Sequence, residues 1–207
     1  MKGKFITFEG PDGSGKTTQI KLAADYLKQK GHHVITAVEP GGTPIGEKIR
    51  AILLDKKNLD MTAKTETLLF LASRAQLVST VIKPALEKEK IVICDRFFDS
   101  TVAYQGIARG LGPEKILEYS LWATGGLEPD LTFLLNVAPD MGFNRKSLSG
   151  AGRDRLESQE QDFMHRVCSG YMDIAQKFKH RFVVIDGEKS IQEVFGIVRD
   201  KIDGLIG

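Results

Sequence analysis

This chain has few cysteines and no marked excess of either charge. Its 207 residues contain two cysteines, Cys94 and Cys168, which lie far apart and lack metal-ligand spacing. We therefore expect buried reduced thiols rather than a disulfide or a zinc site. Lysine and arginine number 29 against 27 aspartate and glutamate, giving a formal net charge of +2. This balance gives no indication that nucleic acid is a partner.

Long apolar runs are also missing. The longest have the length of a β-strand, and Met1–Lys4 leads into one without the apolar core or cleavage site of a signal peptide. We therefore expect a cytoplasmic protein without a membrane partner. Charged residues make up 27% and apolar residues 42%, which is typical of a globular protein. The length predicts one domain over residues 1–207 with a sizeable core.

Apolar runs alternate with amphipathic segments of helical length, which predicts an α/β fold. This βαβ order indicates a parallel sheet with helices on both faces, and its right-handed crossovers bring the loops after the strands to one edge. We expect the loops Gly10–Lys16, Glu39–Thr43 and Asp95–Asp99 to meet there. The predicted strands are Lys4–Glu9, Val34–Val38, Ile91–Cys94, Leu131–Val137 and Phe182–Asp186.

The loop after the first strand carries the strongest motif. Residues 10–17 read Gly-Pro-Asp-Gly-Ser-Gly-Lys-Thr, a complete phosphate loop between a predicted strand and a predicted helix. Its glycines allow a close approach of backbone to phosphate, and the helix start directs N–H groups at the anion. The predicted ATP-binding residues are Gly10, Pro11, Asp12, Gly13, Ser14, Gly15, Lys16, Thr17 and Thr18, and Lys16 is also predicted to be catalytic.

A second motif follows the strand Ile91–Cys94. Asp95 there is typical of an acid that holds Mg²⁺ beside Thr17, although aspartate after a strand also forms turns and caps helices. Its neighbour Arg96 offers a rigid fork of donors suited to a second phosphate. The sequence therefore indicates one phosphoryl group on a donor and one on an acceptor.

Phe70 and Arg74 lie four residues apart in the predicted helix Glu66–Val81, so they share a face. Together they could stack on a nucleobase and bind its polar edge. Phe70 could equally fill the core, and the many leucines around it favour that interpretation.

Motifs spread over nearly the whole chain resemble those of thymidylate kinases. They are Glu39–Gly46, Leu68–Gln76, Asp95–Gly106, Leu127–Leu131 and Asp154–Glu157. The resemblance implies a P-loop NTPase-type sheet of five parallel strands wrapped by helices, and a homodimer. It also implies that the γ-phosphoryl group of ATP is transferred to dTMP with Mg²⁺, giving dTDP and ADP in dTTP synthesis.

The resemblance also assigns roles to single residues. Thr17 and Asp95 would hold Mg²⁺, Asp12 would engage the 3′-hydroxyl of dTMP, and Arg96 its phosphate. Phe70 would stack on thymine, and Tyr104 would exclude ribose. The substrate-binding residues implied in this way are Glu9, Asp12, Glu39, Arg50, Phe70, Arg74, Arg96, Ser100, Thr101, Tyr104 and Gln105, and the catalytic residues are Lys16, Arg96, Arg153 and Arg155.

The two lid arginines in that set follow from a basic, glycine-containing segment at about residues 144–156, which we expect to be a mobile lid. One branch of the family has an arginine in the phosphate loop, where this chain has Gly13. The chain resembles the branch whose lid supplies the arginines, so Arg153 and Arg155 are the candidates. Two positions depart from the family pattern: Val38 replaces a common arginine, and Phe97 replaces a tyrosine.

The phosphate loop taken alone is compatible with three other functions. A kinase for a different small acceptor would share the loop but not the acceptor motifs. A regulatory GTP switch would need a guanine-reading Asn-Lys-x-Asp segment, which this sequence lacks. A silent nucleotide-binding protein is disfavoured because Lys16, Thr17, Asp95 and Arg96 are all present.

Overall fold

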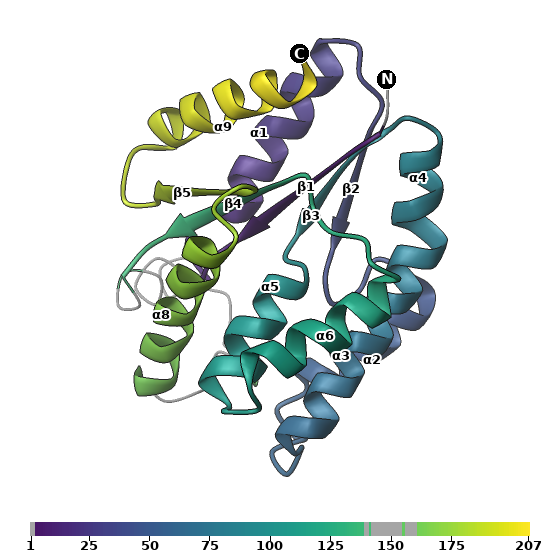
Figure 1. Ribbon diagram of the computed structural model, residues 1–207, viewed down its shortest axis with the longest axis vertical. Helices are drawn as coiled ribbons and strands as arrows, with labels where there is room; N and C mark the ends of the chain where they lie inside the picture. Colours follow the sequence, from purple (N-terminus) through teal and green to yellow (C-terminus); the bar gives the residue numbers. More distant parts are fainter. Residues whose placement is uncertain (1–2, 139–140, 142–154, 156–160) are drawn as a thin grey trace.

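The computed structural model describes residues 3–138, 141, 155 and 161–207. At its centre lies a parallel sheet of five strands in the spatial order β2-β3-β1-β4-β5 (Figure 1). The predicted α/β class and all five predicted strands are confirmed. Strand β3 runs one residue further than predicted, because Asp95 still pairs with Phe8 and Val38. The strands are β1 (Lys4–Glu9), β2 (Val34–Val38), β3 (Ile91–Asp95), β4 (Leu131–Asn136) and β5 (Phe182–Asp186).

Helices cover both faces of this sheet. Helices α1 and α9 pack together on one face, whereas α3, α4, α5, α6 and α8 lie on the other side (Figure 1). Two π-helical turns, η1 and η2, continue α3 and α5. The helical elements are α1 (Lys16–Gln29), α2 (Pro44–Leu54), α3 (Ala63–Leu77), η1 (Val78–Ile82), α4 (Lys83–Glu87), α5 (Phe98–Thr101), η2 (Val102–Ala108), α6 (Pro113–Thr124), α8 (Gln161–Lys177) and α9 (Ile191–Ile206).

The alternation of side chains along β1 decides what faces each helix layer. Ile6 and Phe8 are fully buried in the core cluster with α1 and α9, whereas Phe5 is buried in the cluster on the opposite face. Each fully buried side chain of this size contributes roughly 1.5–3 kcal/mol. Glu9 has the same parity as Phe5, so its carboxylate is on the side of α5 and α8.

Helix α3 begins earlier than the predicted Glu66. The side chain of Thr62 accepts a hydrogen bond from the backbone N–H of Thr65 at 3.2 Å, which caps the helix and starts it at Ala63. The helical path then continues through η1 to Ile82. Phe70 and Arg74 both lie within α3, as the sequence indicated.

Three strand ends meet at one edge of the sheet. Strands β1 and β2 flank β3, and the register aligns Phe8 and Val38 with Asp95. The polar loops after these strands therefore converge, as predicted. Among the described residues, no helix is both long and apolar enough to cross a membrane.

Candidate active site

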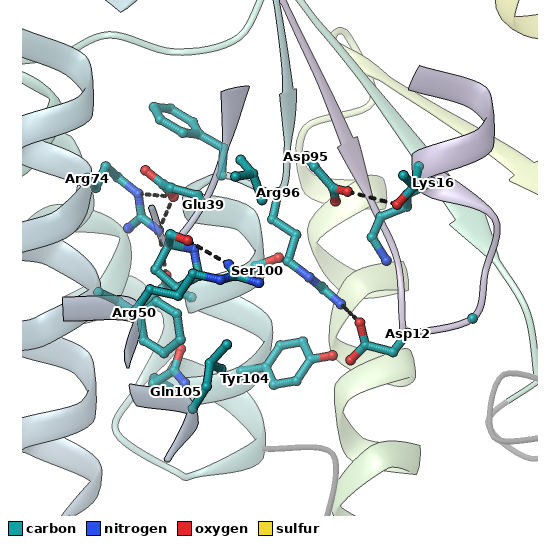
Figure 2. A pocket seen from close by; sticks show the side chains of 18 of the residues that line it. Asp12, Lys16, Glu39, Arg50, Arg74, Asp95, Arg96, Ser100, Tyr104 and Gln105 are labelled. Carbon is teal, nitrogen blue, oxygen red and sulfur yellow. Dashed lines mark hydrogen bonds and ion pairs between the residues drawn. The ribbon is translucent and has the colours of Figure 1, made fainter. Parts of the chain in front are cut away.

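A cavity of about 540 Å³ lies at this edge of the sheet, between the phosphate loop and α3 (Figure 2). Four residues that were not predicted as site residues also line it: Val38, Pro40, Leu54 and Phe97. The predicted site residues that line it are Asp12, Gly13, Gly15, Lys16, Thr17, Thr18, Glu39, Arg50, Phe70, Arg74, Asp95, Arg96, Ser100, Thr101, Tyr104 and Gln105.

The phosphate loop depends on glycine at its first position. Gly10 has φ of 133°, and a Cβ atom there would lie 2.4 Å from the carbonyl oxygen of Leu135. The Nζ atom of Lys16 donates to the carbonyl oxygens of Gly10 at 3.0 Å and Pro11 at 2.8 Å. Burial lowers the pKa of Lys16 to about 8, and the nearby positive charge of Arg96 adds to this effect. The loop thus holds a buried cation over its own backbone.

Oxygen ligands suited to Mg²⁺ lie beside this cation. The hydroxyl of Thr17 donates to Oδ2 of Asp95 at 3.3 Å, so a hydroxyl at the start of α1 and a carboxylate at the end of β3 are adjacent. In the described part of the chain, no group of three histidine, cysteine or acidic residues forms a metal site. This donor set fits Mg²⁺, which is usually held by one or two protein oxygens together with substrate phosphates and water.

Arg96 reaches into the middle of the cavity with a constrained backbone and a constrained side chain (Figure 2). Its φ of 66° is unusual for a residue other than glycine. The Nη2 atom donates to Oδ1 of Asp12 at 2.9 Å, and Nη1 donates to Ser100 at 3.2 Å and to Tyr171 at 2.9 Å. Tyr171 was not predicted as a site residue.

Glu9 lies behind Arg96 and is fully buried. Its carboxylate accepts hydrogen bonds from the backbone N–H of Phe97 at 2.7 Å and from the hydroxyl of Tyr171 at 3.1 Å. The pKa of Glu9 is raised to about 7, mainly by burial and next by the negative charge of Asp99. The predicted substrate contact of Glu9 is therefore indirect in this geometry, through groups that touch the cavity.

The far end of the cavity is apolar on one side and polar on the other. Phe70 is half-buried and lines the cavity, so the interpretation of Phe70 as core filler is wrong. Arg74 is 1% exposed, and it donates from Nε to Oε2 of Glu39 at 2.8 Å and from Nη2 to Thr101 at 2.8 Å. These contacts hold the Arg74 guanidinium in place, 5.5 Å from the centroid of the Phe97 ring.

Two buried oxygen atoms in the cavity wall lack a hydrogen-bond partner among the described residues. They are Oε1 of Glu39 and the hydroxyl oxygen of Tyr104. Burial raises the pKa of both groups. A buried polar atom without a partner is costly, so these two atoms mark places where a polar ligand group would be stabilised.

Glu66 of α3 connects the cavity to the predicted lid and was missed by sequence reasoning. Its Oε1 atom accepts from Nε2 of Gln105 at 2.8 Å, and its Oε2 atom accepts from Nη2 of Arg155 at 2.6 Å. Arg155 is 4% exposed and also donates to the carbonyl oxygen of Leu53, so its guanidinium contacts α2 and α3 rather than the cavity lining. Arg153 and the rest of the predicted lid lie outside the described residues.

The sheet order, the phosphate loop and the cavity at the carboxyl edge place the chain among P-loop nucleotide-binding proteins. The family model for thymidylate kinase matches residues 8–196. The chain therefore belongs to the thymidylate kinase family.

Individual relatives agree over nearly the whole length. A thymidylate kinase of Thermoanaerobacter sp. (strain X514) is 48% identical over 203 residues, covering 98% of this chain and 97% of the relative. That of Geobacillus sp. (strain WCH70) is 43% identical over 209 residues, covering 99% and 100%. The crystal structure of thymidylate kinase from Ehrlichia chaffeensis superposes with a TM-score of 0.79 at 36% identity, covering 98% of this chain and 99% of that one.

Proposed function

We propose that this protein transfers the γ-phosphoryl group of ATP to dTMP, giving dTDP and ADP, with Mg²⁺ as the metal. One observation carries the proposal: a single cavity joins the phosphate loop to an end lined by Phe70 and Arg74. The relatives named thymidylate kinase support the same reaction.

The donor half uses the phosphate loop. Lys16 would bind the β- and γ-phosphate oxygens, and the backbone N–H groups of the phosphate loop other than Pro11, which has none, would hold the rest of the triphosphate. Thr17 and Asp95 would hold Mg²⁺, which neutralises phosphate charge when bound. Their adjacency at 3.3 Å supports this assignment.

The acceptor half uses the loops after β2 and β3 together with α3. Arg96 would bind the dTMP phosphate, Phe70 would stack on thymine, and Arg74 would face its polar edge with Thr101 and Gln105. Tyr104 would lie against the 2′ carbon and Asp12 near the 3′-hydroxyl. The remaining acceptor contacts that we propose come from Glu39, Arg50 and Ser100, and Glu9 would act indirectly through Ser100.

Phosphoryl transfer of this kind proceeds through a loose transition state, so catalysis depends on alignment and charge neutralisation. An oxygen of the dTMP phosphate attacks the γ-phosphorus while the bond to the ADP oxygen breaks. That phosphate is already ionised near neutral pH, so no side chain has to act as a base. We propose Arg153 as the lid arginine that contacts the transferring group, with Arg155 anchoring the segment through Glu66.

We further propose a cytoplasmic homodimer. Helices α3 and α6 pack side by side and expose large apolar side chains: Leu68 is 64% exposed, Tyr119 41% and Trp122 83%. Such an apolar surface is typical of an interface between proteins, and a second copy is the partner implied by resemblance.

A coupled assay of ADP release tests the proposed reaction. ATP and Mg²⁺ are held constant while dTMP, dUMP, UMP, AMP and CMP are compared as acceptors, with Lys16→Ala as the inactive control. We expect the highest kcat/KM with dTMP. Preference for AMP or CMP, or equal turnover by Lys16→Ala, would overturn the assignment.

A further inference from the structure

Tyr171 lies on α8, 75 residues from Arg96 along the chain, yet the two side chains are in contact. Its ring is 1% exposed and belongs to the core cluster formed with Phe163, Val167 and Ile174. Packing explains the ring. Packing does not explain the hydroxyl, because a phenylalanine at this position would fill the same space without one.

The hydroxyl lies among polar groups of the candidate active site. Its oxygen is 2.9 Å from Nη1 of Arg96, 2.7 Å from the hydroxyl oxygen of Ser100 and 3.1 Å from Oε2 of Glu9. These three partners belong to the loop after β3, to α5 and to β1. The Tyr171 hydroxyl therefore links α8 to three elements on the acceptor side of the cavity.

The direction of these hydrogen bonds follows from the groups involved. A guanidinium can only donate and an ionised carboxylate can only accept. Oxygen atoms of Ser100 and Glu9 both lie within reach of the single hydrogen of the Tyr171 hydroxyl, while a lone pair of its oxygen accepts from Arg96. Ser100 bridges the same two residues in the same sense. Tyr171 thus links a buried acid to the arginine that faces the cavity.

Arg96 is held on its other side as well, because Asp12 accepts from Nη2. The contacts with Ser100, Tyr171 and Asp12 use three of the five N–H donors of the guanidinium. These contacts hold the guanidinium in one orientation at the cavity wall. An arginine held before its ligand arrives loses less conformational freedom on binding than a mobile one.

We infer that Tyr171 is a positioning residue, whose hydroxyl fixes Arg96 in the orientation that receives the acceptor phosphate. The inference rests on the proposed function, in which Arg96 binds the phosphate of dTMP. Tyr171 acts through Arg96 and makes no substrate contact of its own.

A double-mutant cycle measured by calorimetry tests this role. The dissociation constants of dTMP and of thymidine, which lacks the phosphate, are measured for wild type, Tyr171→Phe, Arg96→Ala and the double variant. We expect Tyr171→Phe to weaken dTMP binding about tenfold, the size of one lost hydrogen bond to a charged group. Thymidine binding and the KM of ATP should change less than about twofold, and Tyr171→Phe should cost nothing further in the Arg96→Ala background.

Tyr26→Phe is the matched control, because its hydroxyl also bonds a carboxylate, Asp203, but lies between α1 and α9 outside the cavity lining. It should leave dTMP binding unchanged. An equal loss for dTMP and thymidine, or an equal loss with and without Arg96, would show that Tyr171 is only structural and overturn the inference. If Arg96→Ala itself binds dTMP normally, the phosphate assignment under the proposed function fails, and the inference with it.

Discussion

Arg155 and Glu66 form an ion pair inside the protein. The Nη2 atom of Arg155 lies 2.6 Å from Oε2 of Glu66, and the two side chains are 4% and 1% exposed. Glu66 also accepts from Gln105, which lines the acceptor end of the cavity. A residue of the predicted lid is thereby joined to the part of the site that would hold the base.

We predict that Arg155→Ala destabilises the fold as well as lowering activity. Removing one partner of a buried pair leaves an uncompensated charge, which destabilises the fold. We expect a loss of about 3 kcal/mol, the low end of the usual range, because Arg109 remains 3.3 Å from Glu66 and compensates part of its charge. Chemical denaturation measures the loss. Arg199→Ala is the control, since its pair with Asp200 is 48% and 69% exposed and should contribute less than about 1 kcal/mol. Equal stability of the two variants would contradict the structural role of Arg155.

Arg153→Ala should behave differently. The absence of an arginine at Gly13 and the basic character of residues 144–156 motivate a lid arginine that contacts the transferring phosphoryl group. Such an arginine is worth about 10³ in rate or more, and a contact made in the transition state lowers kcat rather than raising KM. Steady-state kinetics with ATP and dTMP checks this, with Lys146→Ala as the control for losing one positive charge. Unchanged kcat in Arg153→Ala would move the role to Arg145.

Local patterns in the sequence were sufficient for the sheet and the phosphate loop. The strand end at Glu9, and that at Cys94 to within one residue, follow from apolar runs, and residues 10–17 match a motif whose spacing the chemistry fixes. Parallel order then brings the loops together without further information. For this reason most of the predicted site residues line one cavity.

Tyr171 and Glu66 could not be predicted in the same way. A lone tyrosine on an amphipathic helix has the pattern of a core residue, and its partner Arg96 is 75 residues away. Glu66 lies in the first turn of α3, where an acidic residue is usual, and its partner Arg155 is 89 residues away. Both roles depend on tertiary contacts for which the sequence holds no spacing rule.

The buried carboxylate of Glu9 predicts a pH dependence of stability. Its pKa is about 7 in the folded protein against an ordinary value of 4.5, so the folded chain holds a proton that the unfolded chain has released. The contribution of Glu9 to stability is therefore complete below pH 4.5 and is lost as pH rises through about 7. Glu9→Gln removes this titration, and its amide can donate to Ser100 and Tyr171 while its oxygen still accepts from Phe97.

Thermal unfolding of wild type and Glu9→Gln at pH 5 and pH 8 measures the effect. We expect the variant to gain stability relative to wild type as pH rises, with the larger Tm difference at pH 8. Glu118→Gln serves as the control, because Glu118 is exposed on α6 and its loss should give no such trend. A Tm difference for Glu9→Gln that does not change between the two pH values would contradict an elevated pKa.

The hydroxyl of Tyr104 offers the sharpest test of acceptor choice. It is buried in the cavity wall without a hydrogen-bond partner among the described residues, so Tyr104→Phe removes no protein contact of that kind. We expect wild type to prefer dTMP over dUMP modestly, since one methyl group is worth about 1 kcal/mol of burial, and to reject UMP more strongly than dUMP.

If the Tyr104 hydroxyl crowds the 2′ position, Tyr104→Phe should narrow the preference for dUMP over UMP by about tenfold. The kcat/KM for dTMP itself should change little, because deoxyribose has no group there. Tyr26→Phe is the control for loss of a tyrosine hydroxyl outside the cavity lining. The measurement is steady-state kcat/KM for dTMP, dUMP and UMP. If the ratio of kcat/KM for dUMP to that for UMP is unaltered in Tyr104→Phe, ribose exclusion comes from the Tyr104 ring or from another residue instead of from the hydroxyl.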